Sequence, residues 1–243
     1  MPSTASKALP FLLVAMLESY GAYRLWPGVR AGSWVLAAMA FSLAWAGLAT
    51  GWVSLAYALE RPALLFKSTP FRGALLPFTL ASGAIARIAN RLGVRERSEV
   101  APGLWVGGWP HAASETWSQM DCTAELPRRG QASDYRCCPM LDGVAPTSSA
   151  LLPAVQQVLD WRSEGRTVLV HCAYGHGRSA IVASAAMVIA GDAPSVDDAI
   201  RRIKSLRPGA RFSPSQRRAV ERAVEVLGVS ENCGYDKSTQ VMP

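Results

Sequence analysis

The stretch from Ala31 to Leu59 contains no charged residue, and no other feature of the sequence constrains the fold as strongly. A helix rises about 1.5 Å per residue, so a helix over this stretch exceeds the roughly 30 Å hydrocarbon core of a bilayer. Buried helices of soluble domains rarely reach this length. Trp34 and Trp52 lie toward its two ends, where amphipathic rings anchor a span at the interfaces. We therefore predict a membrane-spanning helix here.

An earlier apolar run, Ala8–Tyr23, carries a single charge at Glu18, which is costly in lipid unless it faces a partner helix. This run is either the first span of a hairpin or the apolar region of a signal peptide. No small-residue cleavage site precedes the next apolar run, which favours a hairpin with Pro27–Gly28 as its turn. The prediction is a transmembrane hairpin over residues 1–60, with helices at about 8–26 and 33–59.

The net charge of +7 is unevenly distributed along the chain. Residues 1–100 carry ten Lys or Arg and four Asp or Glu, whereas residues 101–243 carry fifteen and fourteen. A basic excess beside apolar segments suits contact with anionic membrane lipids. Because the basic residues alternate with long apolar runs and do not cluster on a polar face, we expect no nucleic-acid partner.

Residues 61–99 form a basic zone around the apolar stretch Ala74–Ala89, which Pro77 and Gly83 interrupt. This stretch is either a third span or an amphipathic segment at the membrane surface, and we favour the second. The positive-inside rule then places the zone and the following domain in the cytoplasm, in a multi-pass protein of the inner or plasma membrane. A span at 74–89 would move that domain to the other side. The basic residues are Arg61, Lys67, Arg72, Arg87, Arg91, Arg95 and Arg97.

From residue 100 to 228 short apolar strands alternate with amphipathic or apolar helices, a pattern typical of an α/β domain. We expect a mostly parallel central sheet flanked by helices, followed by a flexible tail at 229–243. The expected strands lie at 104–106, 119–122, 135–138 and 167–170, and the expected helices at 148–162 and 179–190, with two more opening at Ser195 and Ser213.

The five cysteines are odd in number, and none forms a CxxC pair. With three histidines in the chain, we expect no metal site, no cofactor and a reducing compartment with free thiols. Core packing is the expected role of Cys122, Cys137 and Cys138.

The segment from Val168 to Ser179 runs from a buried strand through a loop of small residues into a helix. Successive backbone N–H groups and a helix N-terminus then point at one spot, which makes an anion site. Gly175 and Gly177 allow unusual backbone conformations, and Arg178 adds a planar fork that can grip two phosphate oxygens. The same positive field favours the thiolate of Cys172, which is placed for in-line attack on phosphorus.

His171-Cys172, five residues, and then Arg178-Ser179 resemble the HCxxxxxR(S/T) signature of the protein-tyrosine-phosphatase superfamily. The form HCxxGxxRS is similar to that of its dual-specificity branch. The alternative is a glycine-rich turn around a buried cysteine, but the motif follows a strand and opens a helix. The similarity covers residues 100–228, where Trp105–Gly108 and Thr123–Pro127 resemble enzymes of plants, bacteria and mitochondria.

This resemblance implies a role for each matching residue. Cys172 would be the nucleophile that forms a phosphocysteine intermediate, and Arg178 would bind the phosphate and stabilise the transition state. Ser179 would donate a hydrogen bond to the sulfur, and His171 would orient the loop. The phosphate-binding loop would comprise Ala173, Tyr174, Gly175, His176, Gly177 and Arg178.

The reaction also needs an acid that protonates the leaving oxygen and a base for the incoming water. In this superfamily one Asp about thirty residues before the cysteine does both, and Asp142 lies at that offset. Asp134 is the second candidate, and a loop-capping role is the alternative for Asp142. Gln216 resembles a glutamine of the family's late helix and is a candidate for positioning water.

The sequence therefore predicts a membrane-anchored, cysteine-dependent phosphatase that acts on a phosphoprotein or a membrane lipid phosphate. A catalytically inert phosphate-binding membrane module is the alternative. The resembled subgroup includes enzymes that act on phosphatidylglycerophosphate, whose loops often carry Lys or an extra Arg. Here the loop has Ala, Tyr, Gly, His and Gly between Cys172 and Arg178, and His176 could add charge near neutral pH or below.

Overall fold

The structure is a computed structural model that describes residues 4–65, 73–91, 97–109, 116–128 and 131–232. The chain divides into two compact units, which are described separately below. The first comprises Met1–Ala89 with Ala124–Arg128, and the second comprises Asn90–Thr123 with Arg129–Pro243.

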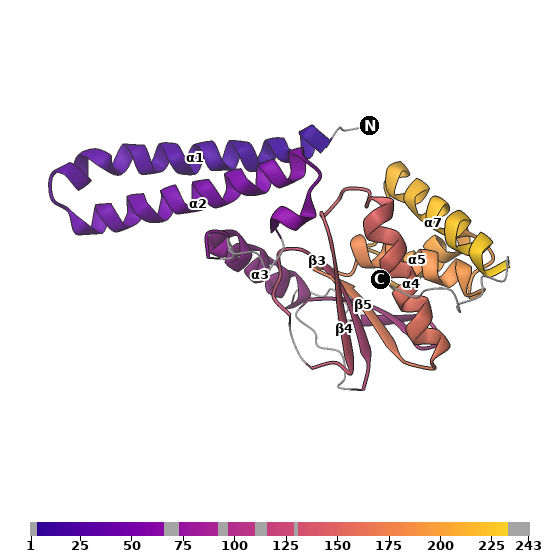
Figure 1. The fold of residues 1–243 in the computed structure, drawn as a ribbon. Coiled ribbons are helices and arrows are strands. Elements are labelled where there is room, and N and C mark those ends of the chain that lie inside the picture. The colour runs from indigo at the N-terminus through magenta and orange to yellow at the C-terminus, as the bar shows by residue number, and fades with distance from the viewer. Residues whose placement is uncertain (1–3, 66–72, 92–96, 110–115, 129–130, 233–243) are drawn as a thin grey trace, which may run out of the picture. The chain divides into compact units, whose positions relative to one another are not determined.

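The first unit is built on a hairpin of two long helices, α1 (Thr4–Arg30) and α2 (Trp34–Ala58) (Figure 1). The predicted turn at Pro27–Gly28 is wrong, because both residues lie inside α1 and the chain reverses at residues 31–33. Gly32 takes the left-handed conformation there (φ 87°), and the Ser33 hydroxyl caps α2 by accepting from the Leu36 N–H at 3.4 Å. Gly28 instead allows close helix approach, since a Cβ at this position would lie 2.1 Å from Leu36 Cδ1.

Small and polar side chains hold the two helices together. A Cβ on Gly47 would lie 2.8 Å from Ser19 Oγ and 3.1 Å from the carbonyl of Ala15, so only glycine permits this spacing. Glu18 faces the partner helix, where the Thr50 hydroxyl donates to its carboxylate at 2.7 Å. The one charged residue of the first apolar run is therefore hydrogen-bonded inside the hairpin.

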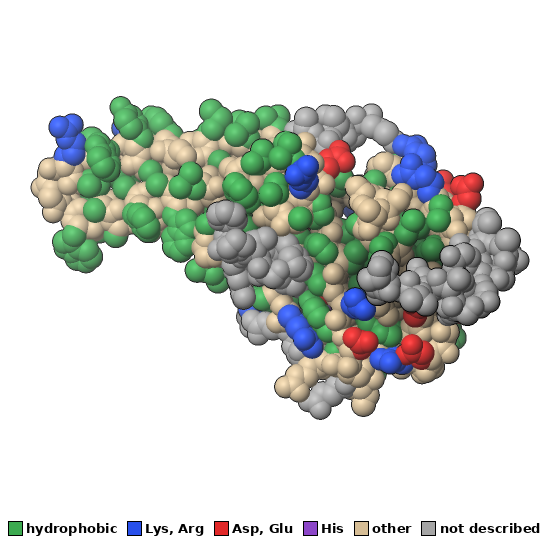
Figure 2. All heavy atoms as spheres, viewed as in Figure 1, with side chains coloured by type: hydrophobic (Ala, Val, Ile, Leu, Met, Phe, Trp, Pro, Cys, Tyr) green, Lys and Arg blue, Asp and Glu red, His purple; other side chains and the backbone are tan. Residues whose placement is uncertain are grey.

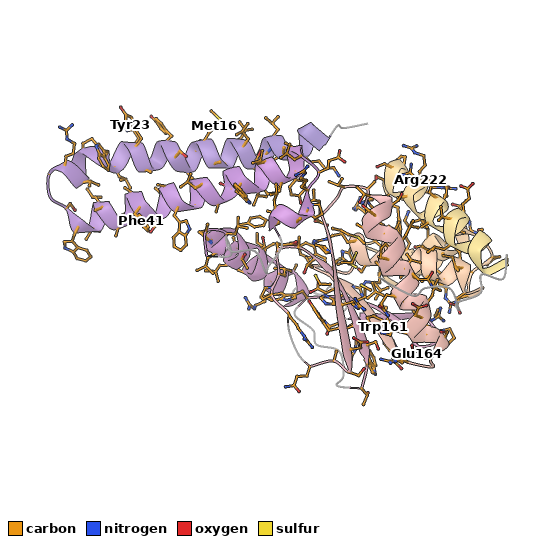
Figure 3. All side chains as sticks on the ribbon, in the orientation of Figure 1. Met16, Tyr23, Phe41, Trp161, Glu164 and Arg222 are labelled. Carbon is orange, nitrogen blue, oxygen red and sulfur yellow. The ribbon has the colours of Figure 1, made fainter. Side chains whose placement is uncertain are left out.

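The hairpin presents an apolar outer surface (Figure 2). Met16, Tyr23 and Phe41 project outward from it (Figure 3), and each is more than 60% exposed. Among the described helices, α2 is the one that is long and apolar enough to cross a membrane, judged by length and composition. α1 is of similar length but does not meet this criterion.

The first unit also contains the short helix η1 (Pro62–Leu65) and most of α3 (Leu76–Arg91). The indole N–H of Trp45 donates to the Ala74 carbonyl at 3.1 Å, just before α3 begins. The predicted basic zone at 61–99 extends too far, because strand β1 (Arg97–Ala101) already belongs to the second unit. The first four residues of β1 alternate between exposed and buried, the period of two that is typical of a strand. Lys67, Arg72 and Arg95 lie outside the described residues.

The second unit is organised around a five-stranded sheet in the order β1-β2-β5-β3-β4. β1 pairs antiparallel with β2 through a tight turn at Gly103 (φ 71°), and all other pairs are parallel, which confirms the predicted mostly parallel sheet. The central strand β5 is buried along its whole length. The other strands are β2 (Leu104–Gly108), β3 (Ser118–Thr123), β4 (Asp134–Met140) and β5 (Val168–Cys172).

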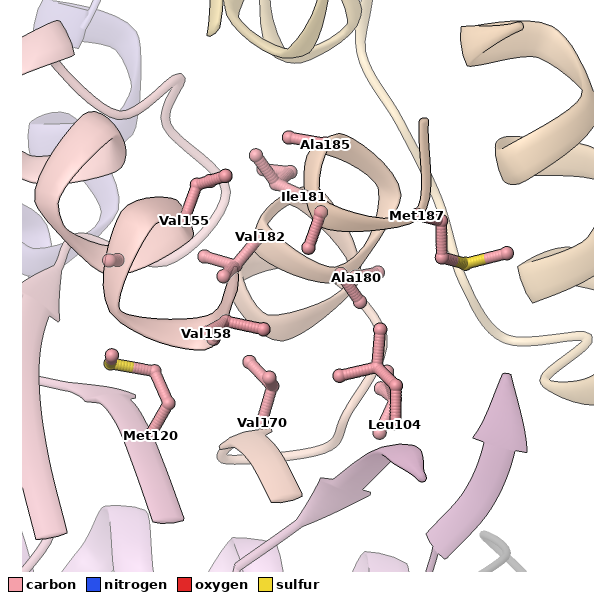
Figure 4. Close-up of a cluster of buried hydrophobic side chains, with 14 of the residues drawn as sticks. Leu104, Met120, Val155, Val158, Val170, Ala180, Ile181, Val182, Ala185 and Met187 are labelled. Atoms are coloured by element: carbon pink, nitrogen blue, oxygen red, sulfur yellow. The ribbon is translucent and has the colours of Figure 1, made fainter. Parts of the chain in front are cut away.

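Four helices accompany the sheet, and α5 is the central one. It is buried on nearly all sides, and its Ile181 and Val182 pack with Val170 of β5 and Val158 of α4 in the core (Figure 4). This packing fixes the end of β5 against the start of α5. The helices are α4 (Ser148–Ser163), α5 (Arg178–Ile189), α6 (Val196–Leu206) and α7 (Pro214–Asn232).

Candidate active site

The candidate site lies where β5 ends and α5 begins. Cys172 is the last residue of β5, and Arg178 is the first residue of α5. Gly177 precedes α5 without a side-chain cap, so the first N–H groups of the helix have no capping oxygen of their own. A strand that delivers the cysteine to a helix N-terminus creates the anion-binding geometry expected from the sequence.

Gly175 gives the loop its shape. Its φ is +70°, and a Cβ there would lie 2.6 Å from the Gly107 carbonyl oxygen and 2.6 Å from Arg207 Nη2. Glycine is required here both by the backbone conformation and by the close approach of β2.

Cys172 is 2% exposed, and its sulfur accepts hydrogen bonds from the loop and from the start of α5. The Gly175 N–H donates at 3.2 Å and the Ser179 hydroxyl at 3.3 Å. Burial by itself raises the thiol pKa, and the Asp142 carboxylate also raises it, but the Arg178 guanidinium and the Ser179 hydrogen bond outweigh them. The pKa of Cys172 therefore lies below its ordinary value, and its thiolate is favoured.

Arg178 is buried beside the loop, and its contacts include the end of β4 and Asp142. Its Nη1 donates to the Met140 carbonyl at 3.1 Å, and its Nε lies 3.4 Å from Asp142 Oδ1. The end of β4 thus fixes the guanidinium, and the guanidinium draws Asp142 to the site.

The structure brings Asp142, not Asp134, to the cysteine. Asp142 and Cys172 line the same pocket of about 590 Å³. Asp134 lies at the opposite end of β4, where it accepts a hydrogen bond from the Trp161 indole at 3.0 Å and pairs with Arg166 at 3.6 Å. Asp134, the second candidate acid, is therefore held by structural contacts away from the pocket.

Gln216 also lines this pocket, near the start of α7. Its Oε1 accepts from the Ser213 N–H at 2.9 Å, and its Nε2 donates to the Val144 carbonyl at 3.4 Å. These bonds tie the first turn of α7 to the loop that carries Asp142.

His171 lies behind the loop and does not line the pocket. It is 2% exposed, and its Nε2 lies 2.7 Å from Gln119 Nε2. An amide nitrogen can only donate, so with this amide orientation the ring nitrogen accepts. Asp121 Oδ1 lies 3.8 Å from the same ring nitrogen.

His176 is half-buried in the pocket wall, and its ring packs on Gly209. Burial lowers its pKa below the ordinary value, and the Arg207 guanidinium lowers it further. The imidazole is therefore neutral at pH 7, and any positive charge it contributes is confined to acidic pH.

Arg207 is the residue that reading the sequence missed. It follows α6 and is 2% exposed. Its guanidinium donates to two loop carbonyls, that of Gly175 at 2.8 Å and that of Tyr174 at 3.0 Å. It also donates to the Val106 carbonyl and the Ser98 hydroxyl, both at 3.3 Å. Because it binds the loop carbonyls, the loop amides can face the other way, toward the sulfur.

Residues 105–222 match the sequence model of the dual specificity phosphatase catalytic domain. The chain therefore contains a domain of this type, which spans just under half of its length. Dual-specificity phosphatases are a branch of the protein-tyrosine-phosphatase superfamily, and this match supports phosphatase activity for the domain.

The solved structures that resemble the phosphatase domain include the following two. A mouse putative dual specificity phosphatase, complexed with zinc tungstate, has a TM-score of 0.50 and 21% identity, covering 56% of this chain and 91% of that chain. DUSP15 has a TM-score of 0.50 and 20% identity, covering 58% and 98%. These likenesses show a shared fold. Comparison with curated proteins gave no match.

Replacing Ser179 should weaken the preference of Cys172 for its thiolate. In Ser179→Ala the pH midpoint for alkylation of Cys172 by iodoacetamide should rise, because a hydrogen bond that stabilises the anion is lost. Mass spectrometry of the Cys172 peptide reads the rate without interference from Cys138, whose burial raises its pKa to about 11. Ser184→Ala, on the same helix, is the matched control. An unchanged midpoint in Ser179→Ala would contradict this account of the sulfur.

Arg207→Ala should disorder the phosphate-binding loop. We expect kcat to fall by roughly 10²-fold, as when a preorganised donor to the transition state is lost. The alkylation midpoint of Cys172 should also rise, because the Gly175 N–H is no longer held toward the sulfur. Arg207→Lys should restore little, since an ammonium cannot reproduce the planar fork. A lower melting temperature with an unchanged midpoint would show that Arg207 is only structural.

Proposed function

We propose that the chain is a membrane-anchored phosphatase in which Cys172 attacks the phosphorus of a bound phosphate monoester. The supporting observation is the state of its sulfur, which is buried, hydrogen-bonded by Gly175 and Ser179, and shifted toward the thiolate by Arg178. A free thiolate at the base of a loop of amides is a nucleophile directed at whatever anion the loop holds.

The first step forms an S–P bond and breaks the ester P–O bond. Asp142 gives its proton to the leaving oxygen, so the alcohol departs neutral. The phosphate sits in the loop from Ala173 to Gly177, with the Arg178 guanidinium on two of its oxygens. Arg178 is already fixed by the Met140 carbonyl, which supports a preorganised role.

The second step returns the enzyme to its starting state. Water attacks the phosphocysteine, the Asp142 carboxylate takes the proton, and the S–P bond breaks to release inorganic phosphate. The Ser179 hydroxyl, 3.3 Å from the sulfur, stabilises the departing thiolate. Gln216 is the side chain that we assign to positioning this water, because it lines the pocket with Asp142. His171 acts from behind the loop by holding the backbone that carries Cys172.

The membrane anchor is proposed from the first unit. α2 has the length and composition of a span, and the paired helix α1 keeps its Glu18 hydrogen-bonded within the hairpin. Basic residues between the hairpin and the phosphatase domain favour a cytoplasmic position for that domain. The substrate is then a phosphate monoester on a protein or lipid at the cytoplasmic face.

Removal of the nucleophile should abolish turnover. Cys172→Ser should lower kcat for para-nitrophenyl phosphate by at least roughly 10³-fold, because an unactivated hydroxyl is a poor substitute for a thiolate. The same variant should still bind inorganic phosphate, as measured by calorimetry. Phosphate release at the parent rate would overturn the assignment, and an inactive parent that still binds phosphate would support an inert module.

Removal of the acid should slow the chemical step by an amount that depends on the leaving group. In Asp142→Asn we expect kcat on an alkyl phosphate to fall by about 10²–10⁴-fold, and less on para-nitrophenyl phosphate, whose leaving group needs little protonation. KM should change little. Asp134→Asn is the matched control, and equal losses in both variants would argue against Asp142 as the acid.

The anchor predicts that the full chain behaves as an integral membrane protein. After expression it should sediment with membranes and resist extraction by alkaline carbonate, yet dissolve in detergent, because burial of the hairpin's apolar side chains outweighs surface electrostatics. Release by carbonate would instead indicate a peripheral attachment.

A further inference from the structure

Two cations at the pocket have no carboxylate partner among the described residues. Lys204 of α6 and Arg211, which follows α6, both line the pocket that contains Cys172, and both side chains are exposed. Their neighbours differ, since Arg201 pairs with Asp198, and Arg217 pairs with Asp197 at 2.8 Å. Lys204 and Arg211 thus bring positive charge to the pocket wall.

Nothing else in the described pocket wall supplies or cancels this charge. Asp142 is the one carboxylate of the described lining, and it already contacts Arg178. His176 is neutral at pH 7, because burial and Arg207 lower its pKa. Lys204 and Arg211 can therefore offer positive charge to a ligand, whereas the side chains between Cys172 and Arg178 offer none at pH 7.

The pocket is too large for a phosphate group alone. Its volume of about 590 Å³ lies within the range of sites that hold small organic molecules, roughly 300–1,000 Å³. Tyr174 and Phe212 add apolar surface to the same wall. A ligand with one phosphate in the loop, a short carbon linker and a second anion would use all of these features.

We propose that Lys204 and Arg211 form a second anion subsite, and that the substrate is a phospholipid whose headgroup ends in a phosphate monoester. The terminal phosphate would occupy the loop of Cys172, and the phosphodiester of the lipid would lie against Lys204 and Arg211. A lipid is favoured over a peptide because the same chain carries an apolar hairpin with exposed Met16, Tyr23 and Phe41. An enzyme held at a bilayer meets headgroups at high local concentration. This inference rests on the proposed phosphatase function and narrows its substrate class.

The test compares two substrates on the full chain in detergent. Para-nitrophenyl phosphate carries one phosphate, whereas dihexanoyl phosphatidylglycerophosphate carries a monoester and a diester phosphate. In Lys204→Gln and in Arg211→Gln, the ratio of kcat/KM for the lipid to kcat/KM for para-nitrophenyl phosphate should fall about tenfold, as for loss of one charge-assisted contact. In the double variant it should fall further.

Arg202→Gln is the matched control. It removes one positive charge from an exposed position of α6 that does not line the pocket, so it should leave the ratio unchanged. A similar fall in all three variants would show a general surface-charge effect and overturn the subsite.

The remaining outcomes separate this inference from the proposed function. A ratio unchanged in both pocket variants overturns the subsite. If a peptide bearing two phosphorylated residues is assayed as a third substrate and only its hydrolysis falls in these variants, the lipid assignment is overturned. A parent that hydrolyses para-nitrophenyl phosphate but not the lipid overturns the substrate class alone. A parent inactive on every phosphate monoester overturns the phosphatase function itself.

Discussion

The site depends on the groups that favour the thiolate form of Cys172 in a buried position. An anion removed from water is costly, and Cys172 is almost completely buried. The Arg178 guanidinium, the Ser179 hydroxyl and the Gly175 N–H offset that cost. The same hydrogen-bond donors and guanidinium also suit a phosphate dianion. One arrangement of these groups therefore stabilises both the nucleophile of the resting enzyme and the phosphate that it attacks.

Two buried arginines have different roles around this sulfur. Arg178 is part of the loop motif and faces the anion, while Arg207 comes from the end of α6 and binds the carbonyls of Tyr174 and Gly175. A loop peptide has two polar ends, and fixing its carbonyl on one side leaves its N–H on the other. Gly175 completes the arrangement, because any side chain there would collide with Gly107 and Arg207.

The parts of this site that are contiguous in the chain could be predicted from the sequence. The strand, the loop and the helix from Val168 to Ser179 appear where the apolar run and the glycines indicate. The offset from Cys172 also indicated Asp142. Only the fold distinguishes it from Asp134, which lies at the far end of β4, the strand that precedes Asp142.

The parts that depend on distant contacts could not be predicted. Nothing local distinguishes Arg207 from the exposed Arg201 and Arg202, because its burial arises only when α6 packs beside β1 and β2. The pairing of β1 with β2 was missed for a related reason, since its charged residues resemble the basic zone that precedes it. The hairpin turn was misplaced because Gly28 serves helix packing and Gly32 serves the turn.

The most direct measurement is rapid acid quenching of the full chain during turnover of para-nitrophenyl phosphate, followed by mass spectrometry of the peptide that contains residue 172. The account predicts a transient adduct with the mass of one phosphoryl group, located on the sulfur of Cys172. Turnover with a phosphoryl group on a different side chain, or a burst of product with no modified Cys172, would contradict it.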